Sequence, residues 1–213
     1  MSFKRFKEIG KVQAEFNIKA VRQMFIDAKD VSPSEHFLNE YAFTLEAIDV
    51  EASEAARTET LIFPILREVY KDYYVEFSLW IQKSISAGKN LNGTPDYLIS
   101  VKSPLGRKVL TTPLLAVVEA KKNDFDTGWG QCLAEMIAVQ LINKNAQKSV
   151  YGIVTDGERW EFGKLENDVF TENLNTFSNE NLPKLFGALH FLFQNFSVGN
   201  TFGGFIGNNA KSA

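Results

Sequence analysis

Two acids and a lysine near the middle of the chain combine the residue types that metal-assisted chemistry needs. Asp96 stands at the start of an apolar segment. A second apolar run, residues 114–118, ends in Glu119, and Lys121 follows two residues later. If residues 114–121 form a strand, side chains alternate between its faces, so Glu119 and Lys121 point to the same side. Two carboxylates and an ammonium group at a strand end can hold a divalent metal ion and activate a water molecule.

Each of these residues also has an ordinary structural interpretation. Asp96 follows Pro95, and this pair by itself is typical of a turn or of the start of a strand. Glu119 and Lys121 could form an exposed ion pair that contributes little to stability. However, the run LLAVV at residues 114–118 is typical of a strand that is buried on both faces. Charges at the end of such a strand favour a functional role.

Three predicted strands, at residues 73–85, 96–102 and 114–121, must bring the candidate residues together. Their aromatic and β-branched residues indicate extended structure, and turn-rich segments separate them. In an antiparallel meander, the start of one strand lies beside the end of the next. The sequence therefore predicts that Asp96 lies next to Glu119.

A helix predicted over residues 50–70 precedes these strands and carries a further candidate acid. Pro64 is expected to kink this helix or to mark a boundary in it. Glu59 directly precedes the apolar run LIFPIL, so its carboxylate would lie at the edge of a buried face. Glu54 is the alternative, because the register of the helix is open.

A second helix is predicted from Gln131 to Leu141 or beyond. Gly128 and Gly130 are expected to loosen the backbone before it begins. Gln131 would then lie at the N-terminal end of the helix, close to the strand end that bears Lys121.

The C-terminal part of the sequence predicts more strands for the same sheet. A strand, a helix and a second strand in succession suit a right-handed crossover, and Asp156-Gly157 is a strong hairpin signal. The elements predicted after the crossover helix are strands at 148–155, 159–165 and 169–173 and an apolar helix at 182–196.

Composition narrows the functional classes. The 213 residues are 45% hydrophobic and 23% charged, which is typical of one globular domain. The net charge of −3 argues against a strongly basic nucleic-acid binder. The chain has a single cysteine, so no disulfide within it is expected. The N-terminus does not resemble a secretory signal, and no run of about twenty apolar residues could span a membrane. Together these features predict a cytoplasmic protein.

We expect a helical arm at residues 1–48, a core at 49–196 and a flexible tail rich in Gly, Asn and Phe at 197–213. Helical spacing of apolar residues runs over 3–28 and again over 34–48. The arm is expected to pack on the core or to form a homodimer surface. A solvated helix face is favoured for the basic residues near its start, with a phosphate contact as the alternative; these residues are Lys4, Arg5, Lys7 and Lys11.

The motif residues together resemble the PD-(D/E)xK nuclease superfamily, which includes the N-terminal nuclease domains of type I restriction motor subunits. The resemblance covers about residues 50–165 and rests on Pro95-Asp96, Glu119-Ala120-Lys121, Gln131 and a preceding helix that bears Glu59. It implies a restriction endonuclease-like core, which is a mixed α/β fold with a central mixed sheet flanked by helices.

The resemblance also implies a metal site. Asp96, Glu119 and the backbone carbonyl of Ala120 would bind Mg²⁺ or Mn²⁺, which prefer oxygen ligands. Lys121 would orient or help to deprotonate the attacking water and stabilise charge at the phosphate.

Two further roles follow from the same resemblance. Glu59 would shape a second metal site or the water network, and Gln131 would donate a hydrogen bond near Lys121 or to a phosphate. The sequence departs from the family in one respect, because the tyrosine that often follows the glutamine by four residues is replaced by Glu135.

The implied function is metal-dependent hydrolysis of phosphodiester bonds, with nucleic acid as the partner. DNA is the expected substrate, and RNA stays an alternative. A catalytically inactive binding or assembly module on the same fold is the other hypothesis, and it is motivated by the acidic net charge and the aromatic-rich helices.

Overall fold

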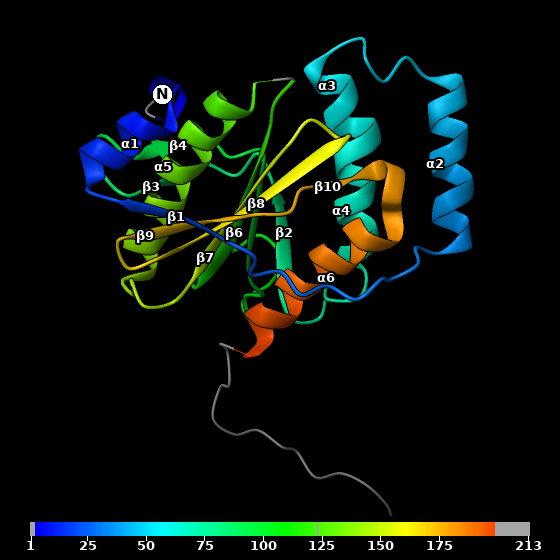
Figure 1. The fold of residues 1–213 in the computed structure, drawn as a ribbon. Helices are drawn as coiled ribbons and strands as arrows, with labels where there is room; N and C mark the ends of the chain where they lie inside the picture. The colour runs from blue at the N-terminus through cyan, green and yellow to red at the C-terminus, as the bar shows by residue number, and fades with distance from the viewer. Residues whose placement is uncertain (1–2, 123, 199–213) are drawn as a thin grey trace, which may run out of the picture.

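A computed structural model describes residues 3–122 and 124–198 of the chain. The fold is mixed α/β, with a large mixed sheet between two groups of helices (Figure 1). This arrangement confirms the predicted mixed α/β class with a central mixed sheet flanked by helices. None of the helices in the described part of the chain is long and apolar enough to cross a membrane.

The main sheet has eight strands in the order β1-β9-β8-β7-β6-β5-β2, with β10 paired to β8. Strands β3 and β4 form a separate two-stranded sheet. The strands are β1 (Lys19–Gln23), β2 (Phe77–Ile81), β3 (Ile85–Ser86), β4 (Asn92–Gly93), β5 (Tyr97–Val101), β6 (Leu114–Ala120), β7 (Val150–Thr155), β8 (Arg159–Glu166), β9 (Val169–Asn173) and β10 (Phe177–Ser178).

Helices cover both faces of the sheet. Figure 1 shows α1 and α5 on one side and α3, α4 and α6 on the other, with α2 outermost. The helices are η1 (Phe3–Arg5), α1 (Ile9–Phe16), α2 (Glu35–Ala47), α3 (Glu54–Arg57), η2 (Thr58–Ile62), α4 (Phe63–Tyr70), α5 (Phe125–Asn143), η3 (Asn179–Asn181) and α6 (Leu182–Val198).

Strand β6 is the centre of the fold. All its residues are buried, as the run LLAVV predicts. It pairs antiparallel with β5, with Tyr97 opposite Val118, and parallel with β7. Helix α5 connects β6 to β7, so the predicted meander and crossover are both present.

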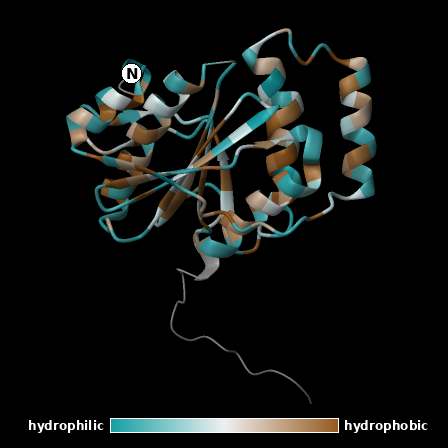
Figure 2. Cartoon of the chain, viewed as in Figure 1, coloured by the Kyte–Doolittle hydropathy of each residue, from teal (hydrophilic) through white to brown (hydrophobic). Residues whose placement is uncertain are grey.

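Two apolar cores lie on opposite faces of the sheet. The first contains Trp160 and Phe186 and joins the sheet to α4 and α6. The second contains Leu133 and Phe170 and joins it to α5 and α1. Figure 2 shows both hydrophobic and hydrophilic residues along the helices that flank the sheet, and the buried residues of α4 are Ile65, Leu66 and Val69. The sheet is therefore held between two helical layers, as buried apolar faces require.

The expectation of helix throughout residues 3–28 is wrong for part of the arm. Helix α1 ends at Asn17, which adopts the left-handed conformation with φ of 54°. Residues Lys19–Gln23 then form β1, which pairs parallel with β9. The strand is exposed along its whole length, so it lacks the alternating burial by which a strand is identified in a sequence.

Helix α5 begins earlier than predicted, with Asp124 as its N-cap. Gly128 and Gly130 lie inside it and do not precede it. A Cβ atom at Gly128 would lie 2.5 Å from Cγ1 of Val154, and one at Gly130 would lie 2.8 Å from the carbonyl oxygen of Phe6. These glycines therefore permit close packing and do not end the helix.

Other boundaries differ less. The strand predicted at 73–85 is split into β2 and β3 by a turn at which Gln82 has φ of 47°. The helix predicted over 50–70 is a succession of α3, a π-helical turn and α4, with Pro64 in the first turn of α4. The predicted tail lies outside the described residues from 199 onward.

Candidate functional site

A cavity of about 350 Å³ opens where the start of β5, the end of β6 and helix α5 meet. Acidic and amide side chains dominate its wall. The lining residues are Phe3, Lys4, Glu54, Gln82, Gly93, Thr94, Asp96, Glu119, Lys121, Gln131 and Glu135.

Asp96 is fixed at the start of β5 by backbone contacts on two sides. Its Oδ2 accepts a hydrogen bond of 2.8 Å from the backbone N–H of Ala120. Its own carbonyl oxygen accepts one of 2.9 Å from the backbone N–H of Gln82. The antiparallel register thus places Asp96 beside the last residues of β6, as predicted.

Glu119 and Lys121 lie on the same side of the chain at the end of β6. Nζ of Lys121 is 2.9 Å from Oε1 of Glu119, and both side chains are largely buried. The backbone N–H of Lys121 donates to the carbonyl oxygen of Thr155, which holds this strand end against β7. The ion pair is therefore part of the cavity wall and not the exposed pair of the alternative interpretation.

Burial and mutual repulsion make the carboxylates in this cavity hard to ionise. Burial, then the charge of Asp96, raises the pKa of Glu119 to about 7, although Lys121 opposes the shift. Burial also raises the pKa of Asp96, against the lowering by the Ala120 N–H group. Burial lowers the pKa of Lys121, but Glu119 and the other acids outweigh it and raise that pKa overall. The site therefore holds more carboxyl groups than Lys121 alone could balance if all of them were ionised.

Gln131 and Glu135 face the cavity from successive turns of α5. Gln131 is 5% exposed and Glu135 only 1%. Oε1 of Gln131 and Oε2 of Glu135 are buried without a hydrogen-bond partner among the described residues. Burial, then Glu119 and Asp96, raises the pKa of Glu135 well above its usual value. Because buried polar atoms are normally hydrogen-bonded, these two oxygen atoms are expected to bind water or a ligand in the cavity.

The acid that reaches the cavity from the preceding helix is Glu54, not Glu59. Glu59 lies exposed in η2 and is absent from the cavity lining. Glu54 lines the cavity, and its charge contributes to the raised pKa values of Asp96 and Glu119. Glu54 is the first residue of α3, and the hydroxyl of the preceding N-cap residue, Ser53, accepts a hydrogen bond from the N–H of Ala56.

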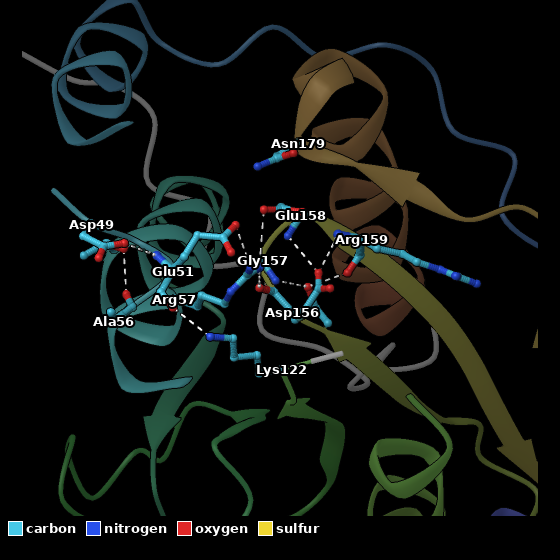
Figure 3. A network of polar contacts seen from close by, with 12 residues as sticks. Asp49, Glu51, Ala56, Arg57, Lys122, Asp156, Gly157, Glu158, Arg159 and Asn179 are labelled. Carbon is cyan, nitrogen blue, oxygen red and sulfur yellow. Dashed lines mark hydrogen bonds and ion pairs between the residues drawn. The ribbon is translucent and has the colours of Figure 1, made fainter. Parts of the chain in front are cut away.

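A buried arginine on α3 fastens the Glu54-bearing helix to the β7–β8 hairpin (Figure 3). Arg57 is 3% exposed, and its guanidinium group donates a hydrogen bond of 3.0 Å to the carbonyl oxygen of Asp156. It also forms ion pairs of 2.8 Å with Glu51 and 3.4 Å with Glu158. Lys122 donates to the carbonyl oxygen of Glu51, so it supports the same connection.

Sequence reasoning missed several residues of the cavity wall. Glu135 gives a signal, because it is an acid inside an otherwise apolar helix. Gln82 follows an aromatic-rich strand and gives none. Lys4 belongs to the basic group for which a solvated helix face was favoured, and its position depends on how the arm packs on the core.

The donor set of the cavity suits a hard divalent cation. Among the described residues, no group of three or more His, Cys, Asp or Glu side chains is arranged to hold a metal ion. Asp96 and Glu119 nevertheless offer two carboxylates to the same cavity. Mg²⁺ is often held by one or two carboxylates with water molecules in the other positions. The surplus of acids fits such an ion.

Comparison of the sequence with models of known families found no match, and comparison with curated proteins found none either. The site therefore has to be interpreted from its own geometry.

Proposed function

We propose that this chain is a metal-dependent nuclease with a restriction endonuclease-like core, which hydrolyses phosphodiester bonds in DNA. One observation carries the proposal. Asp96 and the Glu119–Lys121 ion pair converge from adjacent strand ends in one largely buried cavity. Two acids and a lysine in such a place are unusual for a purely structural role, because burying them costs free energy.

The residues of the cavity have distinct roles in this proposal. Asp96, Glu119 and the carbonyl of Ala120 would hold Mg²⁺ or Mn²⁺, which when bound makes water more acidic and neutralises charge on a phosphate. Lys121 would orient the attacking water and donate a hydrogen bond to the phosphate as negative charge develops there. Gln131 would position water or a phosphate oxygen from α5.

Cleavage of plasmid and single-stranded DNA by the purified protein, with Mg²⁺ or Mn²⁺, tests the proposal. Lys121→Ala and Asp96→Asn should each lower the rate by about 10²-fold or more, as loss of a group acting in the transition state does. Lys108→Ala, which removes an exposed lysine that does not line the cavity, is the matched control and should keep full activity. Activity that survives both site substitutions would refute these roles.

A non-catalytic binding or assembly module is the second candidate function. Four apolar side chains of α2 and its C-terminal end are at least 42% exposed, which is typical of a surface that contacts a partner; these are Leu38, Phe43, Leu45 and Ile48. Calorimetric titration with Mn²⁺ separates the two candidates. Binding that is lost in Glu119→Gln supports the nuclease, and absence of any binding supports the module.

A further inference from the structure

The N-terminal segment, residues 3–16, forms one wall of the candidate site. Phe3 and Phe6 are 2% and 4% exposed and belong to the apolar core on the α5 side of the sheet. The hydroxyl of Thr127, in the first turn of α5, donates to the carbonyl oxygen of Lys7. The segment is therefore anchored on the core by apolar and polar contacts.

Two glycines provide the space in which this segment lies. Gly93 has φ of 157°, and a Cβ atom there would lie 2.4 Å from the ring of Phe3. A Cβ atom at Gly130 would lie 2.8 Å and 2.9 Å from backbone atoms of Phe6 and Glu8. Any larger residue at either position would push the N-terminal segment away. The segment can therefore pack this closely only because both positions are glycine.

This packing brings Lys4 to the cavity. Lys4 lines it together with Asp96, and its side chain is exposed at the rim. Among the described lining residues, the only other cationic side chain is Lys121, which is paired with Glu119 at 2.9 Å. Lys4 thus supplies the accessible positive charge at a cavity whose wall is otherwise acidic.

We propose that Lys4 binds a backbone phosphate of the nucleic-acid substrate next to the bond that is cleaved, and that the N-terminal segment exists in part to hold it there. This inference rests on the proposed nuclease function. A polyanion that approaches carboxylates is repelled, and a lysine at the rim offsets that repulsion at short range.

Binding of labelled oligonucleotides tests the role of Lys4. The full-length protein is titrated with a duplex DNA and with an RNA of the same sequence, in Ca²⁺ in place of Mg²⁺, over a range of NaCl concentrations. Each phosphate contact adds about 0.9 to the slope of log affinity against log salt for B-DNA. Lys4→Gln should lower the slope by about that amount and weaken binding several-fold, whereas Lys4→Arg should keep both.

Lys7→Gln is the matched control, because Lys7 is an exposed lysine of the same segment that does not line the cavity. It should leave slope and affinity unchanged. Thermal unfolding of each variant shows that the fold is retained. An effect of Lys4→Gln on both nucleic acids, or on one of them, supports the inference and identifies which phosphate source is bound.

Two results would contradict the inference, and they are distinguishable. If Asp96-dependent cleavage occurs but Lys4→Gln binds like the unmodified protein, or Lys7→Gln is equally impaired, the role of Lys4 is wrong and the proposed function stands. If the unmodified protein neither binds nor cleaves nucleic acid, the proposed function fails and the role of Lys4 fails with it.

Discussion

Glu119 is an acid in surroundings that oppose its ionisation. It is 5% exposed and shares the cavity with Asp96 and Glu135, and its ion-pair partner is Lys121. Such a carboxylate lowers the stability of the metal-free protein and is favourable once a cation is bound. The same side chain thus links stability, pH and metal binding.

The first prediction concerns the stability of the metal-free protein as a function of pH. Because the folded-state pKa of Glu119 is raised from 4.5 to about 7, the folded protein binds more protons than the unfolded chain between these values. Its contribution to the free energy of unfolding should therefore be lost as pH rises through this window. Urea unfolding in EDTA should show that Glu119→Gln is more stable than the unmodified protein at pH 8, by up to about 3 kcal/mol, and equally stable at pH 4.5.

Asp126→Asn is the matched control, because it alters an exposed acid in the first turn of α5 and leaves the N-cap Asp124 in place. Asp126→Asn should leave the pH dependence as it is. A Glu119→Gln protein that is less stable at pH 8 would show that the ion pair with Lys121 outweighs the cost of burial.

The second prediction separates the two acids of the preceding helix. Glu54 lines the cavity and Glu59 is exposed away from it. Glu54→Gln should weaken Mn²⁺ binding and lower the cleavage rate about 10- to 100-fold, the usual effect of losing a group that supports a metal site. Glu59→Gln should change neither. Calorimetry and cleavage assays on both variants check this, and the reverse pattern would restore the role predicted for Glu59.

At the residue scale, the sequence was informative where the chemistry depends on local geometry. Asp96, Glu119 and Lys121 follow from strand alternation and an antiparallel register, which short-range patterns reveal. Lys4 and Glu54 depend on how whole segments pack against the sheet. No local pattern specifies those contacts.

At the scale of elements, the position of Glu54 depends on the attachment of α3. Arg57 reaches from α3 to the hairpin between β7 and β8, where Gly157 adopts φ of 93°. Its two acidic partners are largely exposed, with side-chain exposures of 60% and 51%. The arginine itself is buried, so the connection depends on it more than on either acid.

The third prediction is that Arg57→Met lowers the free energy of unfolding by about 1–3 kcal/mol, because it removes a buried charged donor and leaves the Asp156 carbonyl unpaired. Metal binding should also weaken, because α3 carries Glu54. Chemical denaturation and Mn²⁺ titration measure the two effects. Arg67→Met, at an exposed position of α4, is the control and should stay within about 0.5 kcal/mol.

Elements with a strong local signal were the ones that the sequence predicted. The strand β6 and the hairpin at Asp156-Gly157 carry strong local signals, and both are present. Strand β1 carries none, because its five residues are exposed and its pairing with β9 is made only in the folded chain. Glycines inside α5 were misread as a helix boundary, because packing space cannot be identified from one sequence.

At the scale of the molecule, the two apolar cores share the sheet that separates them. Strand β6 contributes Leu115 and Val118 to the core of α4 and α6, and Leu114 and Val117 to the core of α5. Loss of either core would expose one face of the central strand. The two halves are therefore expected to unfold together.

The fourth prediction follows from this sharing. Trp160 is buried in one core and Trp129 in the other, and Trp80 packs against the second. Variants that retain only Trp160 or only Trp129, with the other tryptophans replaced by phenylalanine, should each give one urea transition that coincides by fluorescence and far-UV circular dichroism. A fluorescence midpoint for Trp129 below the circular dichroism midpoint would show that the α5 side unfolds separately.

The pairing of β1 with β9 also affects the order in which the protein can fold during synthesis on the ribosome. Lys19 and Val169 are register partners, although 150 residues separate them. At about 5–20 residues per second, the ribosome needs roughly 8–30 s to add the second partner after the first. Phe3 and Phe6 emerge even earlier and remain without the core that buries them until α5 and the later strands follow. The wall that holds Lys4 would thus be among the last parts of the site to form.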